Sequence, residues 1–398
     1  MKQPDVSVII VNYNSSGYTI DCVKSITDND VEIIIVDNSP LPGEPERLKS
    51  IDDARVKIIF NEINSGFAKS SNQGIIASKG RYIFLLNPDT IVIKDCIRKL
   101  VTYMETLPKA GAVGPRMWWD RDKTLQSPEI IMPSPLEDIK HSLAGVSAFS
   151  GLIMRHYAKK NRHFYTAALP FKVGMIPGAA LLTTREVIEK VGLLDERYPL
   201  YFEDADWSRR VLSKGFKLYL APDAEICHFI SQSARHCQGE SANKFRYSES
   251  LYRSRYYNRF FHLVSNGVSG AIHTFDKFDK LGKIGKLIKP GKPGGGVLTG
   301  GLTDLGRITT PPSFITDGCP SGGNSSYEHS SDGYSKDKFL FQLSTDLTFI
   351  PSVGMVSGYP SYTISDEIWS YIHDGVFFTR FIELASYKPI STWRFEKA

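Results

Sequence analysis

The chain has 398 residues, of which 41% are hydrophobic and 23% are charged, and its formal net charge is +5. These proportions are typical of a soluble globular protein, and the length predicts two or three domains. The longest apolar runs have the length of strands, far below the ~20 residues that a membrane-spanning helix needs. No small-residue cleavage site follows the first apolar run, so we expect no signal peptide.

The cysteines are scattered and odd in number, which predicts free thiols in a reducing compartment. They are Cys22, Cys96, Cys227, Cys237 and Cys319. Two of them adjoin histidines, but the spacing of these pairs matches no usual zinc finger or knuckle.

The first 120 residues alternate apolar runs of strand length with helix-like stretches. The expected strands are Val6–Val11, Val31–Val36, Lys57–Phe60 and Tyr82–Leu86, and the expected helices are Tyr18–Ile26 and Ala68–Ser78. Such a pattern indicates a mainly parallel sheet covered on both faces by helices. Polar residues follow each strand, and parallel strands bring their carboxyl ends to one edge, where ligands bind. These residues are Asn12, Asp37, Asn61 and Asp89.

Residues 120–170 contain several prolines and a basic patch at Arg155–His163, and we expect an irregular excursion or lid on the acceptor side. Regular structure is expected again after this segment. The expected strands are Val173–Thr183, Phe216–Ala221 and Glu225–Phe229, and the expected helices are Arg185–Val191 and Glu203–Lys214.

The composition changes beyond residue 240. Residues 244–265 are aromatic and basic and are expected to be helical, and residues 291–301 resemble a flexible glycine-rich linker. Residues 302–398 have the composition of a small β-rich appendage. We therefore expect an α/β domain (1–240), a helical and linker segment (241–301) and an accessory domain of unknown role (302–398).

The strand Tyr82–Leu86 stops at Asn87-Pro88-Asp89. Asn87 and Asp89 are two residues apart, so in an extended backbone their side chains project from the same side. A carboxylate at the rim of an open α/β sheet is well placed to hold a metal ion against a diphosphate. The alternative is an ordinary Asn-Pro-Asp turn that ends a strand.

Three carboxylates, Glu203, Asp204 and Asp206, lie within four residues at the expected start of a helix. The helix dipole and the free N–H groups favour ionised carboxylates at this position. An ionised carboxylate can act as a general base. The alternative is an acidic first turn that only caps the helix.

Several motifs in the same order resemble the family 2 glycosyltransferases, which are inverting enzymes with the nucleotide-sugar-binding GT-A fold. The resemblance spans about residues 5–265 and is greatest to the rhamnosyltransferase-type branch. Its motifs are Val8–Asn14, Ile34–Ser39, Asn64–Lys69, Asn87–Asp89 and Gly192–Trp207. It implies a Rossmann-like, mixed and mainly parallel sheet flanked by helices, with residues 1–240 as the catalytic domain.

The resemblance implies a set of residues that bind the nucleotide sugar. They are Asn12, Asn14, Asp37, Asn64, Gly66, Phe67, Asn72, Asn87, Gly178, Ala179 and Arg210. The carboxylate of Asp37 can accept the imide N–H of uracil or thymine. Gly66 allows the backbone to approach an anion at the start of a helix. For Asn72 the alternative to ligand contact is a structural role, in which its side chain holds a neighbouring segment in place.

The metal motif of the family is usually Asp-x-Asp, and this chain has Asn87 at the first position. The resemblance therefore implies that Asp89 makes the direct bond to Mg²⁺ or Mn²⁺ and that Asn87 bonds ribose or metal-bound water. His228 would complete the metal site. Asp204 would be the general base, and the other two carboxylates of the acidic turn would orient the acceptor or a loop.

The expected function is metal-dependent, inverting transfer of rhamnose or a hexose from a dTDP- or UDP-sugar. The expected acceptor is a hydroxyl of a saccharide or lipid-linked saccharide in surface polysaccharide biosynthesis. The alternative is a catalytically inactive protein that binds sugar nucleotides or carbohydrate. A nucleotidyltransferase is disfavoured, because no glycine-rich basic signature for a triphosphate lies near the N-terminus.

Residues 240–293 contain eleven Lys and Arg against four Asp and Glu. This charge predicts either a solvated linker or attraction of residues 244–292 to anionic lipid. We expect a cytoplasmic protein, and the second interpretation implies that it is peripheral on the inner face of the plasma membrane. Nucleic-acid binding is not expected, because no recognition motif accompanies the charge.

Overall fold

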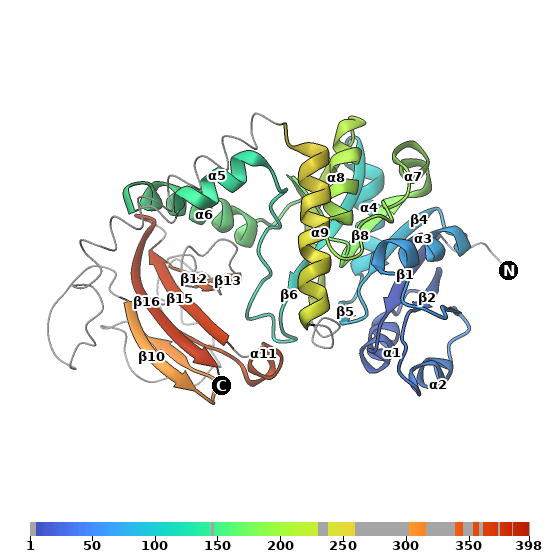
Figure 1. The fold of residues 1–398 in the computed structure, drawn as a ribbon, viewed down its shortest axis with the longest axis horizontal. Helices are drawn as coiled ribbons and strands as arrows, with labels where there is room; N and C mark the ends of the chain where they lie inside the picture. The colour runs from blue at the N-terminus through green and yellow to red at the C-terminus, as the bar shows by residue number, and fades with distance from the viewer. Residues whose placement is uncertain are drawn as a thin grey trace, which may run out of the picture. The chain divides into compact units, whose positions relative to one another are not determined.

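The computed structural model describes residues 5–144, 147–229, 238–258, 302–315, 339–344, 353–357, 361–372, 375–383 and 385–397 (Figure 1). The chain divides into two compact units. The first consists of residues 1–124, 130–132 and 167–256, and the second of residues 125–129, 133–166 and 257–398. The domain boundaries expected at residues 240 and 301 stay a prediction, and one helix, α9, runs through the first of these positions.

The described strands of the first unit form one nine-stranded sheet. Eight of them follow the order β3-β2-β1-β4-β8-β6-β9-β5, and β7 pairs with β9. The strands are β1 (Val6–Asn12), β2 (Val31–Asp37), β3 (Val56–Phe60), β4 (Tyr82–Leu86), β5 (Thr90–Val92), β6 (Ala110–Trp118), β7 (Phe171–Val173), β8 (Ala180–Thr184) and β9 (Lys217–His228). The helices are α1 (Ser16–Ser25), α2 (Glu44–Lys49), α3 (Phe67–Ala77), α4 (Cys96–Thr106), α7 (Arg185–Val191), α8 (Glu203–Ser213) and α9 (Gln238–Tyr256).

The central strands are apolar because both faces of the sheet are covered. Every residue of β1 and β2 is buried, as expected for parallel strands with helices on both sides. Strand β1 pairs in parallel with β2 and with β4, and β2 pairs in parallel with β3. The carboxyl ends of these four strands therefore meet at one edge, where the register places Asn12 beside Asp37.

The strand direction changes at β8, which runs antiparallel to β4 and places Ala180 beside Leu86. The end of β9 pairs antiparallel with β5 and places His228 beside Thr90. These pairings bring the loop before β8 and the end of β9 to the residues that follow β4. The expected strand Val173–Thr183 is in fact two shorter strands, β7 and β8. The predicted mixed, mainly parallel α/β fold is confirmed.

The prediction of irregular structure over residues 120–170 is wrong. This segment contains two helices of the second unit, α5 (Pro135–Ala144) and α6 (Ser147–Thr166). A proline at the first helical position is favourable, because its missing N–H would have no partner there. The hydroxyl of Ser134 accepts from the N–H of Glu137 at 3.3 Å. The proline and serine therefore mark a helix start.

The described C-terminal strands form a five-stranded sheet of order β10-β16-β15-β12-β13 and a two-stranded sheet of β11 and β14. The elements are β10 (Leu302–Ile308), β11 (Ser313–Ile315), β12 (Phe339–Ser344), β13 (Val353–Ser357), β14 (Ser361–Thr363), α11 (Asp366–Tyr371), β15 (Gly375–Glu383) and β16 (Lys388–Lys397). Buried aromatic rings form the core, as where Phe341 and Phe381 lie with centroids 5.1 Å apart. The predicted β-rich C-terminal region is confirmed.

Within the described part of the chain, no helix is long and apolar enough to cross a membrane. Most of the basic segment 244–292 lies outside the described residues, so its attraction to lipid stays a prediction. Two of its arginines, in α9, form ion pairs within the protein: Arg253 with Glu249 and Arg255 with Asp206, each at 2.9 Å. The cysteines of the described part, Cys22, Cys96 and Cys227, are all buried.

Candidate active site

The ends of β1 and β2 carry a hydrogen-bonded polar cluster. Asn12 donates from Nδ2 to Asp37 Oδ1 and to Ser39 Oγ, both at 2.9 Å, and its Oδ1 accepts from Thr19 Oγ1 at 2.7 Å. The hydroxyl and the N–H of Ser39 also donate to Asp37 Oδ1. Among the described residues these bonds all use one oxygen of Asp37, so its Oδ2 keeps its acceptor capacity. Asn12 is fully engaged and holds Asp37 in place.

Two loops of the edge have positive φ angles, 52° at Asn14 and 79° at Gly66. Asn14 Oδ1 is buried and has no hydrogen-bond partner in the described part of the chain, as expected for an atom that binds ligand or water. Gly66 donates its N–H to Asn64 Oδ1 at 3.0 Å. A Cβ at Gly66 would lie 3.3 Å from Pro199 O, so both φ and space require glycine. Phe67 then begins α3.

Asn72 connects α3 to the loop that follows α7. Its Nδ2 donates to Leu194 O and to Glu196 Oε1, both at 2.9 Å, and its Oδ1 accepts from Leu194 N at 3.1 Å. The side chain is buried. Of the two roles considered for Asn72, these bonds favour the pinning of a neighbouring segment.

Asn87, Asp89 and His228 come together where β4 and β9 end. His228 Nε2 lies 3.3 Å from Asp89 Oδ1 and 3.4 Å from Asn87 Nδ2. The backbone fixes this arrangement, because Phe229 N donates to Asp89 O at 2.9 Å and Thr90 Oγ1 donates to Asn87 O at 2.7 Å. A carboxylate and an imidazole are therefore directed at the same point.

Asp89 and His228 together offer one carboxylate and one imidazole to a divalent cation. A carboxylate oxygen and an imidazole nitrogen this close together suit a cation that takes its other ligands from a diphosphate. Within the described ranges, no group of three or more His, Cys, Asp or Glu side chains could hold a metal ion by itself. The residues fit a cation that is shared with a bound nucleotide.

Glu203 and Asp204 begin α8 in different environments. Asp204 accepts from Gly178 N at 3.1 Å and from Ala205 N at 2.8 Å. Glu203 Oε2 is buried and has no hydrogen-bond partner among the residues described. Burial raises the pKa of both carboxyls, and the neighbouring charge of Asp204 raises the pKa of Glu203 further. The two N–H groups favour an ionised Asp204, so we assign the proton of the pair to Glu203.

The loop before β8 joins the acidic helix start to the end of β4. Besides its bond to Asp204, Gly178 lies against α3, since a Cβ on it would be 3.0 Å from the ring of Phe67. The next residue, Ala179, accepts from Asn87 N at 2.9 Å. A short path of contacts therefore runs from the predicted base to the predicted metal turn.

The pKa of Tyr201 is a second indication that the acidic residues of the Asn87–Asp89 turn and of the start of α8 lie near one another. Partial burial raises this pKa, and so does the nearness of the acidic groups Glu203, Asp89 and Asp204. The phenol of Tyr201 is therefore near both Asp89 and the first residues of α8. Sequence reasoning gave no role to Tyr201, although it directly precedes the acidic turn.

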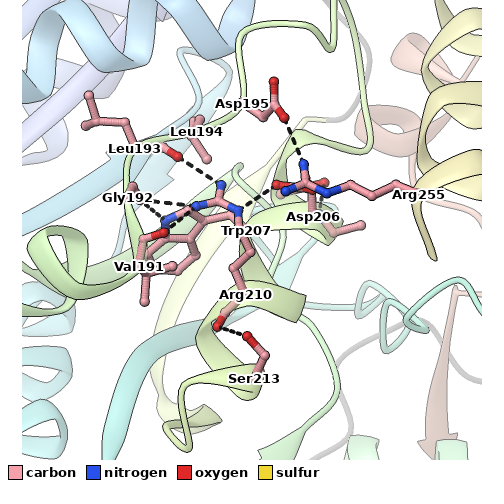
Figure 2. Close-up of polar contacts among 12 residues, drawn as sticks. Val191, Gly192, Leu193, Leu194, Asp195, Asp206, Trp207, Arg210, Ser213 and Arg255 are labelled. Carbon is pink, nitrogen blue, oxygen red and sulfur yellow. Dashed lines mark hydrogen bonds and ion pairs between the residues drawn. The ribbon is translucent and has the colours of Figure 1, made fainter.

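Arg210 faces the loop after α7, as Figure 2 shows. Its Nε donates to Asp206 Oδ2 at 2.8 Å, its Nη1 to Val191 O at 2.7 Å and its Nη2 to Leu193 O at 2.8 Å. All three guanidinium nitrogens thus have protein acceptors. These contacts are those of a positioning residue and give no support to the prediction that Arg210 binds the nucleotide sugar.

Asp206 is completely buried, 0% exposed, in the same network. Its Oδ1 accepts from the hydroxyl of Tyr256 at 2.7 Å and lies 2.9 Å from Arg255 Nη1, which also pairs with Asp195 (Figure 2). Asp206 thereby joins α8 to α9, which fits the loop-orienting role and not contact with an acceptor. No local sequence pattern connects residue 206 with residues 255 and 256, so sequence reasoning missed these two partners.

A mixed sheet whose edge carries an Asn-Pro-Asp turn and an acidic helix start has the arrangement of the GT-A glycosyltransferases. Residues 7–192 match the family model described as Glycosyl transferase family 2. The matched residues belong to this family, so the resemblance seen in the sequence is confirmed and the chain is a glycosyltransferase.

Similar proteins include rhamnosyltransferases. The dTDP-rhamnosyl transferase RfbF of Shigella flexneri is 26% identical over 234 residues, which cover 58% of this chain and 71% of the relative. The N-acetylglucosaminyl-diphospho-decaprenol L-rhamnosyltransferase of Mycobacterium tuberculosis (strain H37Rv) is 25% identical over 241 residues, 57% of this chain and 76% of the relative. Among solved structures, the mannosyltransferase PcManGT of Pyrobaculum calidifontis in complex with GDP-Man and Mn²⁺ is 13% identical, covers 71% of this chain and 76% of its own, and has a TM-score of 0.43.

Proposed function

We propose that the enzyme transfers rhamnose or a hexose, with inversion, from a dTDP- or UDP-sugar to a hydroxyl of a saccharide or lipid-linked saccharide in surface glycan synthesis. One observation carries this proposal: the N–H of Gly178 bonds Asp204 while the neighbouring Ala179 bonds Asn87. A sugar at that loop would have a base on one side and a diphosphate site on the other. The rhamnosyltransferases among the relatives support the choice of donor.

Asp37 is the residue proposed to recognise the pyrimidine base. Its Oδ1 is held by Asn12 and Ser39, and its Oδ2 can accept the imide N–H of thymine or uracil. Cytosine and purines do not present an N–H in the same way. The unpartnered oxygen of Asn14 is available to a ligand at the same edge.

Asp89 and His228 are the proposed protein ligands of Mg²⁺ or Mn²⁺. A bound cation would offset the negative charge that develops on the departing nucleoside diphosphate. Asn87, within 3.4 Å of the His228 ring, is neutral and orients the imidazole or a ribose hydroxyl.

Asp204 is the proposed general base. Its carboxylate removes the proton of the acceptor hydroxyl as that oxygen bonds the anomeric carbon, and the bond from that carbon to the diphosphate oxygen breaks. Attack on the face opposite the diphosphate inverts the anomeric configuration. Glu203, which carries the proton of the pair, does not compete for this task, and Arg210 with Asp206 holds the helix start in position.

The test compares Asp204→Asn with the wild type, using dTDP-rhamnose and UDP-hexoses with Mn²⁺. We expect release of nucleoside diphosphate to fall about 10²- to 10⁴-fold, the usual contribution of a general base. Thermal stabilisation by dTDP and Mn²⁺ should persist, because the substitution is nearly isosteric. The control is Asp122→Asn, which changes an exposed carboxylate and should leave turnover unchanged.

The competing function is a protein that binds sugar nucleotides without catalysis. It is favoured if the wild type is stabilised by these donors but releases nucleoside diphosphate from none of them. Retention of full turnover by Asp204→Asn would instead refute the assignment of the base.

A further inference from the structure

The chain enters α8 through two consecutive residues in the left-handed region. Tyr201 has φ 64° and Phe202 has φ 69°. Large side chains are rarely found in this region, and such outliers gather where a fold directs side chains into a functional site. The outlier pair directly precedes Glu203 and Asp204, so the same turn sets the direction of the Tyr201 ring and of the proposed base.

Aromatic rings of α9 meet this turn, and α8 and α9 run side by side in Figure 1. Phe245 lies edge-on to Tyr201 with ring centroids 5.9 Å apart, and Phe202 lies between Phe245 and Tyr252, with centroids 5.4 Å from each. Tyr252 is fully buried and packs against the inner side of Phe202. Phe202 is half-buried between the two helices.

The outer rings of this cluster remain open to solvent. Tyr201 is 46% exposed and Phe245 is 41% exposed. The two rings are held by Phe202 and Tyr252 on one side and open to solvent on the other, beside the proposed base, so they are available to a ligand. Tyr201 lies three residues before Asp204 and Phe245 packs against it, so this exposed pair adjoins the proposed base.

We propose that Tyr201 and Phe245 form a stacking platform for the acceptor saccharide, with the acceptor sugar's C–H face on the rings and its hydroxyl toward Asp204. Aromatic faces carry partial negative charge and attract the weakly positive C–H groups of a pyranose. This inference rests on the proposed function, because it assigns the acceptor side of the same site. It also predicts a saccharide in place of a peptide or small alcohol as the acceptor.

The test uses saturation-transfer NMR on the full chain with dTDP and Mn²⁺ present. The probes are the methyl pyranosides of glucose, galactose, mannose, rhamnose and N-acetylglucosamine. We expect saturation of the ring C–H protons of at least one probe in the wild type and in Tyr201→Phe, which keeps the ring. The signal should fall at least fivefold in Tyr201→Ala and in Phe245→Ala.

The matched control is Tyr247→Ala. Tyr247 is 59% exposed and lies two residues from Phe245 in α9, so it projects from the opposite side of the helix. This variant should keep the wild-type signal. The inference is overturned if no probe is saturated in the wild type, or if Tyr201→Ala and Phe245→Ala keep the signal.

Thermal stabilisation by dTDP with Mn²⁺ separates this failure from failure of the proposed function. If each variant keeps that stabilisation, it is folded and its donor side is intact. Loss of the probe signal alone then reports the acceptor platform. Absence of nucleotide stabilisation in the wild type would refute the proposed function itself, whatever the probes show.

Discussion

At the scale of single residues, Glu203 and Asp204 illustrate how neighbours in sequence acquire opposite protonation. Asp204 accepts two backbone N–H groups, whereas an oxygen of Glu203 is buried without a partner in the described residues. Desolvation acts on both, but only one of them receives hydrogen bonds that stabilise its charge. The proposed general base can therefore be ionised in a setting that favours a neutral neighbour.

The raised pKa of Glu203 predicts the stability of Glu203→Gln. In the unfolded chain the carboxyl ionises near its ordinary pKa, whereas the folded protein resists ionisation, so wild-type stability falls as pH rises between the two values. Glu203→Gln has no carboxyl group at this position, so its stability does not fall over this pH range. We expect it to be more stable than the wild type at pH 8, on the order of 1–3 kcal/mol, with a smaller difference at pH 5.

Urea denaturation at both pH values measures this difference. Glu62→Gln, at an exposed position, is the control and should change stability little at either pH. A Glu203→Gln variant that is less stable than the wild type at pH 8 would show that the buried carboxylate is charged and paired in the folded protein.

The types of the site residues could be predicted from sequence, but several of their roles could not. Asp37, Asp89 and Asp204 follow apolar strands or open a helix, which is a local signal. Asn72 and Arg210 sit in equally suggestive places, yet Asn72 bonds Leu194, 122 residues away, and Arg210 bonds Leu193, 17 residues away, both on the loop after α7. Partners so distant in sequence depend on how helices pack, which no local pattern encodes.

At the scale of elements, the four strands that open the chain were predicted to within about one residue, because they are continuous apolar runs, and β1, β2 and β4 are buried on both faces. Strand β6 was not anticipated, since Gly111, Gly114 and Pro115 interrupt its apolar pattern, and the register shifts after Pro115. Prolines near the start of α5 likewise led to a prediction of irregular structure where a helix begins. Such residues mark strand irregularities and helix starts as often as loops.

Two helical glycines provide a matched test of how elements pack. A Cβ on Gly74 of α3 would overlap Ile9 Cγ2 of β1, whereas a Cβ on Gly17 of α1 would meet nothing within 4 Å. Gly74→Ala should destabilise the protein by about 1–3 kcal/mol, because α3 must move off the sheet. Gly17→Ala should stabilise it by about 0.5–1 kcal/mol, because alanine loses less backbone entropy in a helix.

Chemical denaturation of both variants measures the two effects. The opposite signs make the comparison internally controlled, since both substitutions add the same methyl group to a helix. Equal effects would show that the contact between α3 and β1 does not limit stability.

At the scale of the whole molecule, every described candidate site residue belongs to the first compact unit. The family match ends at residue 192, and it lies mostly in this unit but also includes α5 and α6 of the second. The second unit contains α5, α6 and the C-terminal sheets, and it lies largely beyond the matched residues. We therefore expect donor binding to be a property of the first unit.

Hydrogen exchange tests this division on the intact protein. A nucleotide that binds only the folded first unit stabilises it by RT ln(1 + [L]/Kd), about 2.7 kcal/mol at one hundred times Kd. With dTDP and Mn²⁺ we expect slower exchange at the ends of β1, β2 and β4 and at the start of α3. Exchange in β12, β15 and β16 should not change.

The control for this experiment is Asp89→Asn, which removes the proposed carboxylate ligand of the cation. In that variant the protection should no longer depend on Mn²⁺, although weaker protection by dTDP alone can remain through Asp37. Protection that appears in the C-terminal strands and not at the ends of β1 and β2 would contradict the assignment of donor binding to the first unit. Because exchange is read peptide by peptide, this result would also show which part of the second unit responds.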